Sequence, residues 1–236
     1  MKLYSELAYC WSILSPHGVY DHEASIFYEL LNSPSSILEL GSGIGALLES
    51  LTPFVSCTLV DISLDMLRIS KERNPKAEHI NEDILQLRLA KKYDAVLIHD
   101  VIMYMNTPEK LKEILETARH HLKCGGHVLL IPDVFQEDFE ERALQGGGTD
   151  GETSVQLMEW HWDCDPNDTS YQVEFSLLIR KNGKVFSHHE CHTLALFSRL
   201  DYREALMSCG FELISIPEAP YLLARKPAEN AKKGAD

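Results

Sequence analysis

The run from Glu39 to Gly45 (Glu39-Leu40-Gly41-Ser42-Gly43-Ile44-Gly45) constrains this chain more than any other feature. An apolar stretch leads into three glycines at alternate positions, and residues 46–51 follow with the apolar spacing of a helix. The pattern predicts a strand, a tight turn and a helix, the first half of a βαβ unit. Glycine suits the turn because positive φ angles cost little without a Cβ and because a ligand can approach the bare backbone. Taken alone, the turn also fits an ordinary strand-to-helix connection.

Two acidic residues follow the glycines at the ends of the next two predicted strands. Asp61 ends the apolar strand 56–60, and a carboxylate at this place can accept both hydroxyls of a ribose. Asp83 ends a short strand over residues 77–84, where it can accept from an adenine amino group while Ile84 packs on the ring. Glycines, ribose acid and adenine acid occur in that chain order, which predicts a site for an adenosine-type ligand.

These motifs resemble those of the class I S-adenosylmethionine-dependent methyltransferases. The resemblance also includes Asp61-Ile62-Ser63-Leu64-Asp65-Met66-Leu67 and the strand 93–98, and it covers residues 37–134 and the two C-terminal strands. The resemblance implies an α/β, Rossmann-like, mostly parallel seven-stranded sheet with helices on both faces and a closing antiparallel hairpin. It implies S-adenosylmethionine as cofactor, with its methionine part over the glycine turn and Glu39 organising that turn or its waters. The cofactor residues it implies are Tyr20, Glu39, Gly41, Ser42, Gly43, Gly45, Asp61, Ile62, Met66, Asp83, Ile84 and His99.

Two other functions remain as alternatives. An NAD-dependent oxidoreductase would space its last two glycines by two residues to seat a pyrophosphate on a helix N-terminus, whereas Gly43 and Gly45 are separated by one. A catalytically inactive binding or scaffold protein would be expected to have lost part of the cofactor motifs, which are all present here.

Candidate catalytic residues follow the central strand 93–98. Because ligands bind at the carboxyl ends of strands in an open α/β sheet, His99, Asp100 and Tyr104 are well placed to contact substrate or cofactor. His188 and Glu190, in a later strand, are further candidate proton acceptors. For Tyr20, just before the helix 23–31, contact with the methionine carboxylate and simple packing on the sheet are both open.

Residues 135–197 predict an inserted lid in an otherwise single domain. We expect a short helix over 136–144, a flexible glycine-rich loop over 146–151, and an antiparallel three-stranded meander over 155–163, 171–180 and 185–197. The final strand and the helix after it resemble the lids of small-molecule methyltransferases that dimethylate amino sugars. After the lid, we expect a helix over 199–209, closing strands over 211–217 and 221–226, and a disordered tail over 228–236.

Composition narrows the substrate and the location. With 36 acidic against 22 basic residues the net charge is −14, and no basic stripe for a nucleic acid is present. We expect a small polar metabolite, an amine or a sugar, in a monomer or homodimer. Six cysteines without a Cys-x-x-Cys pair read as reduced, buried thiols, and no apolar stretch approaches about 18 residues. These features predict a cytoplasmic protein without a membrane segment.

Histidines and cysteines near the lid do not predict a metal site. Strand alternation places His188 and His192 on one face but His189 and Cys191 on the other, so four ligands would not converge. His120 and His121 end the predicted helix 108–122, where imidazolium would complement the helix dipole.

The predicted reaction is in-line displacement of a sulfonium methyl group by nitrogen or oxygen of the substrate. Alignment and desolvation can supply most of the acceleration, at the upper end about 7–11 kcal/mol.

Overall fold

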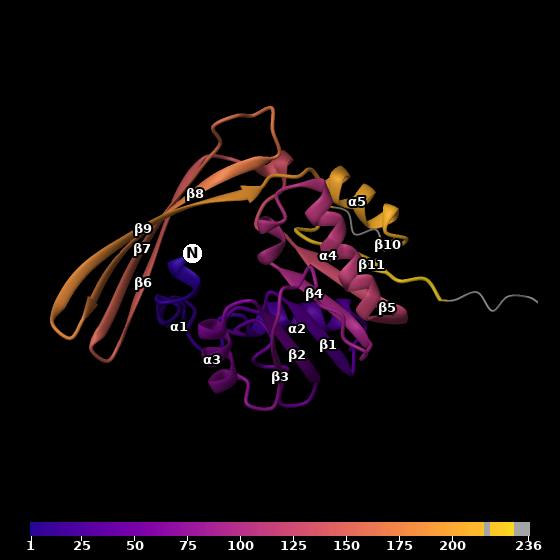
Figure 1. The fold of residues 1–236 in the computed structure, drawn as a ribbon, viewed down its shortest axis with the longest axis horizontal. Helices are drawn as coiled ribbons and strands as arrows, with labels where there is room; N and C mark the ends of the chain where they lie inside the picture. The colour runs from indigo at the N-terminus through magenta and orange to yellow at the C-terminus, as the bar shows by residue number, and fades with distance from the viewer. Residues whose placement is uncertain (215–217, 229–236) are drawn as a thin grey trace, which may run out of the picture.

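The computed structural model describes residues 1–214 and 218–228, and its centre is a seven-stranded sheet (Figure 1). The strand order is β10-β11-β5-β4-β1-β2-β3, and only the pairings of β11 with β5 and β10 are antiparallel. This confirms the predicted mostly parallel sheet with a closing hairpin. The strands are β1 (Ser36–Leu40), β2 (Ser56–Asp61), β3 (Glu78–Asn81), β4 (Tyr93–His99), β5 (Leu122–Ile131), β10 (Glu212–Ile214) and β11 (Leu222–Arg225).

Apolar side chains cover both faces of this sheet, as its near-continuous apolar strands require. Leu38, Val96 and Val128 pack with helix α4 (Pro108–His121) on one face. Ile37, Leu97 and Leu129 pack with helix α2 (Asp21–Leu30) on the other. The remaining helices are η1 (Lys2–Tyr4), α1 (Tyr9–Leu14), α3 (Leu64–Arg73), η2 (Val101–Tyr104), η3 (Gln136–Asp138) and α5 (Arg199–Ser208).

The helix expected directly after the glycine turn is not a regular helix. Residues 47–54 form consecutive hydrogen-bonded turns instead. Two local features account for this difference. Pro53 has no backbone N–H to continue a helical ladder, and the Thr52 hydroxyl donates to the carbonyl oxygen of Glu49 at 3.2 Å.

The lid has four antiparallel strands, in the order β6-β7-β8-β9, where the sequence predicted three. The extra strand β6 (Arg142–Asp150) contains the glycine run that we expected to be a loop, and the expected helix over 136–144 is reduced to η3. Gly147 is a glycine because the adjacent strand β7 is too close for a side chain. A Cβ at this position would lie 2.7 Å from the carbonyl oxygen of Val155. A Cβ on Gly148 would lie 3.0 Å from Ile13 of α1, which packs against β6 and β7.

The other three lid strands are β7 (Thr153–Trp162), β8 (Ser170–Lys181) and β9 (Lys184–Ala195), and their two faces differ as alternation predicted. The inner face is apolar and includes the buried Tyr171, Val173 and Phe175. On the outer face, Met158 is 55% and Trp160 59% exposed. In Figure 1 the lid rises from the sheet and extends over the N-terminal segment.

Several smaller expectations need correction. Cys124, Cys164 and Cys191 are exposed, so only part of the cysteines are buried thiols. His121 does not act as an imidazolium: its Nδ1–H donates to Thr117, its Nε2 accepts from the Leu89 N–H, and burial lowers its pKa to about 4.

The chain ends mostly as the sequence predicted. The strand β5 begins at Leu122 rather than His127, because Gly125 and Gly126 exchange backbone hydrogen bonds with Lys226. Of the predicted closing strand 211–217, residues 215–217 lie outside the described residues. So do residues 229–236, which include nearly all of the predicted disordered tail.

Helix α5 offers a test of local stability, because Ser198 and Asp201 cap its N-terminus reciprocally. Replacing Ser198 with Ala removes the side-chain acceptor for the Asp201 N–H, and we expect the free energy of unfolding to fall by about 1 kcal/mol in urea denaturation. Ser208→Ala, at the exposed end of the same helix, is the control and should change stability by less than about 0.5 kcal/mol. Equal losses in both variants would contradict the capping role.

Candidate active site

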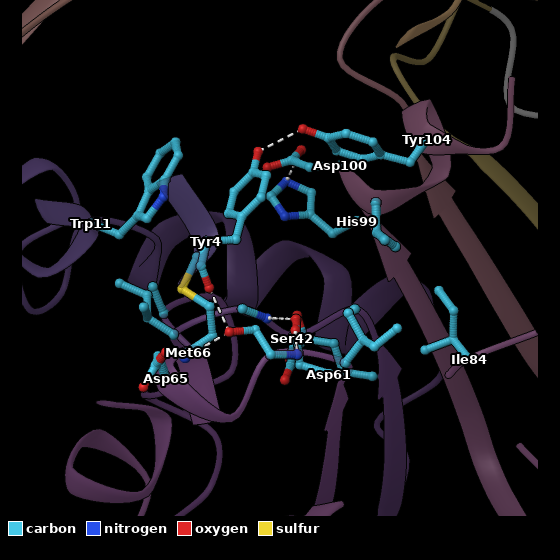
Figure 2. A pocket seen from close by; sticks show the side chains of 18 of the residues that line it. Tyr4, Trp11, Ser42, Asp61, Asp65, Met66, Ile84, His99, Asp100 and Tyr104 are labelled. Atoms are coloured by element: carbon cyan, nitrogen blue, oxygen red, sulfur yellow. Dashed lines mark hydrogen bonds and ion pairs between the residues drawn. The ribbon is translucent and has the colours of Figure 1, made fainter. Parts of the chain in front are cut away.

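A cavity of about 680 Å³ lies at the carboxyl ends of β1, β2 and β4, beneath the N-terminal segment (Figure 2). Eleven of the twelve predicted cofactor residues line it; the exception is Gly45. Of the predicted catalytic residues, His99, Asp100 and Tyr104 line the cavity, and His188 and Glu190 do not. Parallel strands bring these groups together because their carboxyl ends meet at one edge of the sheet.

The three glycines of the turn are required for different reasons. All three have positive φ angles. A Cβ on Gly41 would lie 2.5 Å from Val101, so this glycine lets the turn pack against η2. Only Gly43 faces open space, with no protein atom within 4 Å of an added Cβ. The bare backbone at Gly43 is therefore where a ligand can approach.

Gly45 supports the turn from behind. A Cβ there would lie 2.4 Å from Asn74 Nδ2 and from Ser70 Oγ. The fully buried Asn74 donates from Nδ2 to the Gly45 carbonyl oxygen at 2.9 Å, and its Oδ1 lies 3.2 Å from the Thr52 hydroxyl, a donor that it shares with the Glu49 carbonyl oxygen. This side chain thus joins the glycine turn to the segment that follows it.

Asp61 organises the rim of the cavity. One carboxylate oxygen accepts the Gly43 N–H and the other the Ser63 N–H, both at 2.8 Å. Burial raises the pKa of Asp61, and these backbone N–H groups oppose that shift. Because each carboxylate oxygen has two acceptor sites, Asp61 retains capacity to accept ribose hydroxyls while holding the turn.

Two buried polar atoms in the wall have no hydrogen-bond partner among residues 1–214 and 218–228. They are Glu39 Oε2 and Ser42 Oγ, and both residues line the cavity. Burial, followed by the charges of Asp100 and Asp61, raises the pKa of Glu39 to about 8. A cationic ligand bearing hydrogen-bond donors would satisfy both atoms and offset the excess of acids. S-adenosylmethionine, with its ammonium and sulfonium groups, fits this donor and acceptor pattern.

Two aromatic residues of the N-terminal segment form the roof of the cavity. Tyr4 and Trp11 stack with ring centroids 5.8 Å apart, and the Ser63 hydroxyl donates to the Tyr4 carbonyl oxygen. Figure 2 shows both side chains over the space above Asp61 and Met66. Neither residue is among the site residues predicted from the sequence. Their only signal was the aromatic content of residues 1–34.

Tyr104 connects the roof to the lid. Its hydroxyl is 2.7 Å from the Tyr4 hydroxyl and 2.8 Å from Nδ1 of His192, a buried lid residue absent from the predicted site. Burial raises the pKa of Tyr104, so its hydroxyl stays protonated at neutral pH. Tyr104 is therefore a hydrogen-bonding residue of the cavity wall, and a catalytic role for it remains a prediction.

His99 and Asp100 line the polar end of the cavity, and Asp133 lies next to Asp100 outside the cavity lining. His99 Nε2 lies 3.0 Å from Asp100 Oδ1, and Tyr20 packs edge-on to the His99 ring at 5.9 Å (Figure 2 shows the first contact). The Asp100 carboxyl is hydrogen bonded to that of Asp133, whose side chain sequence reasoning missed. Asp100 and Asp133 are both exposed, and the Asp100 side chain is 54% exposed, so a small ligand can reach the pair.

The pKa values of His99 and Asp133 are shifted mainly by burial. Burial lowers the pKa of His99, so the ring is neutral near pH 7. Burial and the neighbouring Asp100 charge raise the pKa of Asp133 well above its usual value. Two adjacent carboxylates cannot both ionise readily, and the hydrogen bond between them raises the pKa of Asp133 and lowers that of Asp100.

Asp100 has a strained backbone, with φ 48° and ψ −46°. Its N–H donates to Ile131 and its carbonyl oxygen accepts from Met103, so the surrounding structure holds this conformation. Strain of this kind costs about 1–3 kcal/mol and occurs mainly at functional sites. It turns the carboxyl toward Asp133.

His188 and Glu190 lie on β9, outside the cavity wall. Glu190 accepts the backbone N–H groups of Lys2 and Leu3 at 3.0 and 2.7 Å, and His188 Nε2 is 2.8 Å from the same carboxylate. Burial opposes ionisation of Glu190, but the His188 and Leu3 hydrogen bonds outweigh it and lower its pKa. The Glu190 carboxylate therefore connects the N-terminal segment to the lid. A proton-acceptor role for His188 or Glu190 remains a prediction.

Residues 1–214 and 218–228 contain no group of three or more His, Cys, Asp or Glu residues arranged to hold a metal ion. In the same part of the chain, no helix is long and apolar enough to cross a membrane.

Comparison with known proteins agrees with this geometry. A family model described as a methyltransferase domain matches residues 38–128. A dTDP-3-amino-3,4,6-trideoxy-alpha-D-glucopyranose N,N-dimethyltransferase from Streptomyces venezuelae is 28% identical over 210 residues, covering 85% of this chain and 87% of the relative. A dTDP-3-amino-3,6-dideoxy-alpha-D-glucopyranose N,N-dimethyltransferase from Streptomyces fradiae is 27% identical, covering 79% and 73%.

Solved structures share the whole architecture. The crystal structure of Streptomyces venezuelae DesVI has a TM-score of 0.79 at 23% identity, covering 94% of this chain and 96% of that one. The S-adenosylmethionine-bound structure of CalS10, an amino pentose methyltransferase from Micromonospora echinaspora, has a TM-score of 0.73 at 18% identity, covering 94% and 95%. At such identities these structures establish the fold.

The fold, the cavity and the matched methyltransferase domain together indicate an S-adenosylmethionine-dependent methyltransferase with a Rossmann-like fold.

The role of Asp61 can be tested by cofactor binding. Asp61→Asn leaves the side-chain size but removes the charge that accepts ribose hydroxyls, and we expect calorimetric affinity for S-adenosylhomocysteine to fall about 10- to 100-fold. Glu116→Gln, an exposed charge change on α4, should bind like the wild type. Unchanged affinity in Asp61→Asn would contradict the ribose role.

Glu39 predicts a pH-dependent stability in the ligand-free protein. Its folded pKa of about 8 lies above the unfolded value near 4.5, so the folded state holds an extra proton between these values. Its contribution to stability is complete below about pH 4.5 and is lost as pH rises toward 8. Glu39→Gln should therefore raise the free energy of unfolding at pH 8 more than at pH 5, by an amount on the order of 1 kcal/mol. Equal effects in urea denaturation at both pH values would contradict a buried, protonated Glu39.

Proposed function

We propose that this enzyme methylates the amine nitrogen of a small hydroxyl-bearing metabolite of the amino-sugar class. The observation that carries the proposal is the carboxyl pair Asp100–Asp133 at the end of the cofactor cavity. An ionised Asp100 attracts a substrate ammonium, whereas a neutral hydroxyl acceptor gains much less from a negative charge. The named activities of the two Streptomyces relatives, both N,N-dimethyltransferases of amino sugars, support the same choice.

The chain's own residues can orient the acceptor and take up its proton. S-adenosylmethionine supplies, when bound, a methyl group on a positively charged sulfur that is already activated for displacement. Asp100 accepts a hydrogen bond and then a proton from the substrate ammonium, which leaves a neutral amine with a free lone pair. The chain's residues would thereby present a neutral amine to that methyl group, and transfer of the methyl to nitrogen would leave S-adenosylhomocysteine as the second product.

Closure of the site excludes water from this reaction. Tyr4 and Trp11 cover the cavity, and Tyr104 hydrogen bonds both to Tyr4 and to His192 of the lid. These contacts hold the reacting atoms in line and keep water away from them. Alignment and desolvation are the two effects that the sequence analysis expected to accelerate methyl transfer. A cytoplasmic location and a monomeric or homodimeric state remain predictions of the sequence alone.

Turnover of paired substrates tests the proposal. Amino sugars such as glucosamine, each paired with the sugar that has a hydroxyl in place of the amine, are incubated with S-adenosylmethionine, and S-adenosylhomocysteine release is measured. We expect release with amines only, and mass spectrometry should show the added methyl on nitrogen. Turnover of the hydroxyl partners alone would overturn the choice of nitrogen.

The carboxyl pair should control this turnover. Asp133→Asn keeps the shape but removes the shared proton site, and we expect kcat/KM for the amine to fall about 10- to 100-fold. Affinity for S-adenosylhomocysteine should stay within about twofold, because Asp133 does not line the cofactor cavity. Wild-type kcat/KM in Asp133→Asn would contradict the role of the pair.

A further inference from the structure

Four side chains form a series of polar contacts that runs from the lid into the cofactor cavity. The series begins at Glu190 and continues through the buried His192, both on β9. It passes to Tyr104 at the end of η2 and ends at Tyr4 in the N-terminal segment. Tyr4 and Tyr104 line the cavity. Two hydroxyl groups therefore connect the space for the ligands to a carboxylate of the lid.

The Glu190 carboxylate sets the direction of the hydrogen bonds in this series. It accepts the Lys2 and Leu3 N–H groups and lies 2.8 Å from His188 Nε2. Burial opposes its ionisation, but the hydrogen bonds from His188 and Leu3 outweigh burial and lower its pKa. An ionised carboxylate offers lone pairs only. A ring nitrogen of His192 that faces it must therefore carry a proton.

This requirement places the single ring proton of His192 on Nε2. Nε2 lies 3.6 Å from Glu190 Oε1, slightly beyond a hydrogen bond, and it has no hydrogen-bond partner among residues 1–214 and 218–228. Burial lowers the pKa of His192, so the ring is neutral and its other nitrogen, Nδ1, is an acceptor. Nδ1 therefore accepts the Tyr104 hydroxyl at 2.8 Å.

The same direction continues to Tyr4. Because the Tyr104 proton is directed to His192, the Tyr104 oxygen is the acceptor in its 2.7 Å contact with the Tyr4 hydroxyl. A hydroxyl that donates its proton keeps its acceptor lone pairs. In Figure 2 the Tyr4 hydroxyl points to the same end of the cavity as the Asp100 carboxyl. The Tyr4 oxygen is therefore a hydrogen-bond acceptor at this end of the cavity.

An acceptor in this place suits the amine of a substrate held by Asp100. Asp100 directly precedes η2, the short helix that ends at Tyr104, so the carboxyl and the two hydroxyls belong to one compact region. A neutral primary amine has two N–H groups and one lone pair. When Asp100 and Tyr4 each accept one N–H, rotation about the C–N bond is restricted and the lone pair has one remaining direction. Fixing a nucleophile in this way accelerates transfer by alignment.

We propose that Tyr4 is a second hydrogen-bond acceptor for the substrate amine, and that Tyr104 and His192 are positioning residues that fix the direction of its hydroxyl. This inference rests on the proposed function. It gives the N-terminal segment a part in orienting the nucleophile, in addition to covering the cofactor.

Deletion of the Tyr4 hydroxyl tests the acceptor role. Tyr4→Phe keeps the ring that stacks on Trp11 and the backbone carbonyl that accepts from Ser63. We expect kcat/KM for an amino sugar to fall about 10- to 50-fold, mostly in kcat, with S-adenosylhomocysteine affinity within about twofold of the wild type. Tyr9→Phe is the matched control, because it makes the same deletion in the same segment outside the cavity lining. It should turn over like the wild type.

Three outcomes are decisive against one part of the account or another. Wild-type kcat in Tyr4→Phe would overturn the acceptor role, because the roof stays intact in this variant. A loss of S-adenosylhomocysteine affinity equal to the loss in kcat/KM would also overturn it, since the Tyr4 oxygen would then contact the cofactor ammonium. Failure of the wild type to methylate any amine would count against the proposed function instead.

A double-mutant cycle tests whether Tyr104 acts through Tyr4. Tyr104→Phe removes the acceptor for the Tyr4 proton, so the Tyr4 hydroxyl can turn and donate into the cavity. We expect kcat/KM to fall about 5- to 20-fold, and the double variant with Tyr4→Phe to fall no further than Tyr4→Phe alone. Wild-type kcat/KM in Tyr104→Phe, or additive losses in the double variant, would overturn the shared role.

Two substitutions of His192 test the acceptor at Nδ1. His192→Leu removes that acceptor and should lower kcat/KM about as much as Tyr104→Phe. His192→Asn places an amide oxygen near the position of Nδ1, and we expect it to restore at least about a third of the wild-type kcat/KM. Both variants are compared after their S-adenosylhomocysteine affinity has been measured by calorimetry. An equal loss of kcat/KM in the two variants would overturn the positioning role of His192.

Discussion

The hydrogen bonds from the Gly43 and Ser63 N–H groups to Asp61 are the interaction on which the rest of the site depends. They fix the glycine turn after β1 against the end of β2, so the cavity has a defined floor before any ligand binds. Gly45 can approach Asn74 only because it has no side chain, which holds the back of the turn. Pre-formed geometry of this kind lowers the ordering cost of binding.

The site is a negatively charged space arranged for positive partners. Glu39, Asp61 and Asp100 lie in one cavity wall, and burial raises the pKa of each. A cationic cofactor and a cationic amine both relieve this excess of acid, whereas a phosphate would increase it. The same excess of negative charge therefore favours both a cationic cofactor and a cationic acceptor.

Local sequence motifs predicted much of the sheet and of the cofactor site. The parts of the site that depend on long-range packing could not be predicted. Asp61 and Asp83 could be placed because each follows a short apolar strand, and strand ends converge in a parallel sheet. Tyr4, Asp133 and His192 reach the site only through the folding of the N-terminus and lid over it, for which one chain segment gives no signal. The glycines of β6 predicted a loop because their reason, close contact with β7 and α1, is tertiary.

Ligand-dependent stabilisation of the wild-type protein tests the central claim most directly. The account predicts that S-adenosylhomocysteine at saturating concentration raises the melting temperature in a thermal-shift titration, because it binds the folded state alone. NAD, which needs a pyrophosphate site that Gly43 and Gly45 do not form, should leave it unchanged. Stabilisation by NAD and none by S-adenosylhomocysteine would contradict the account.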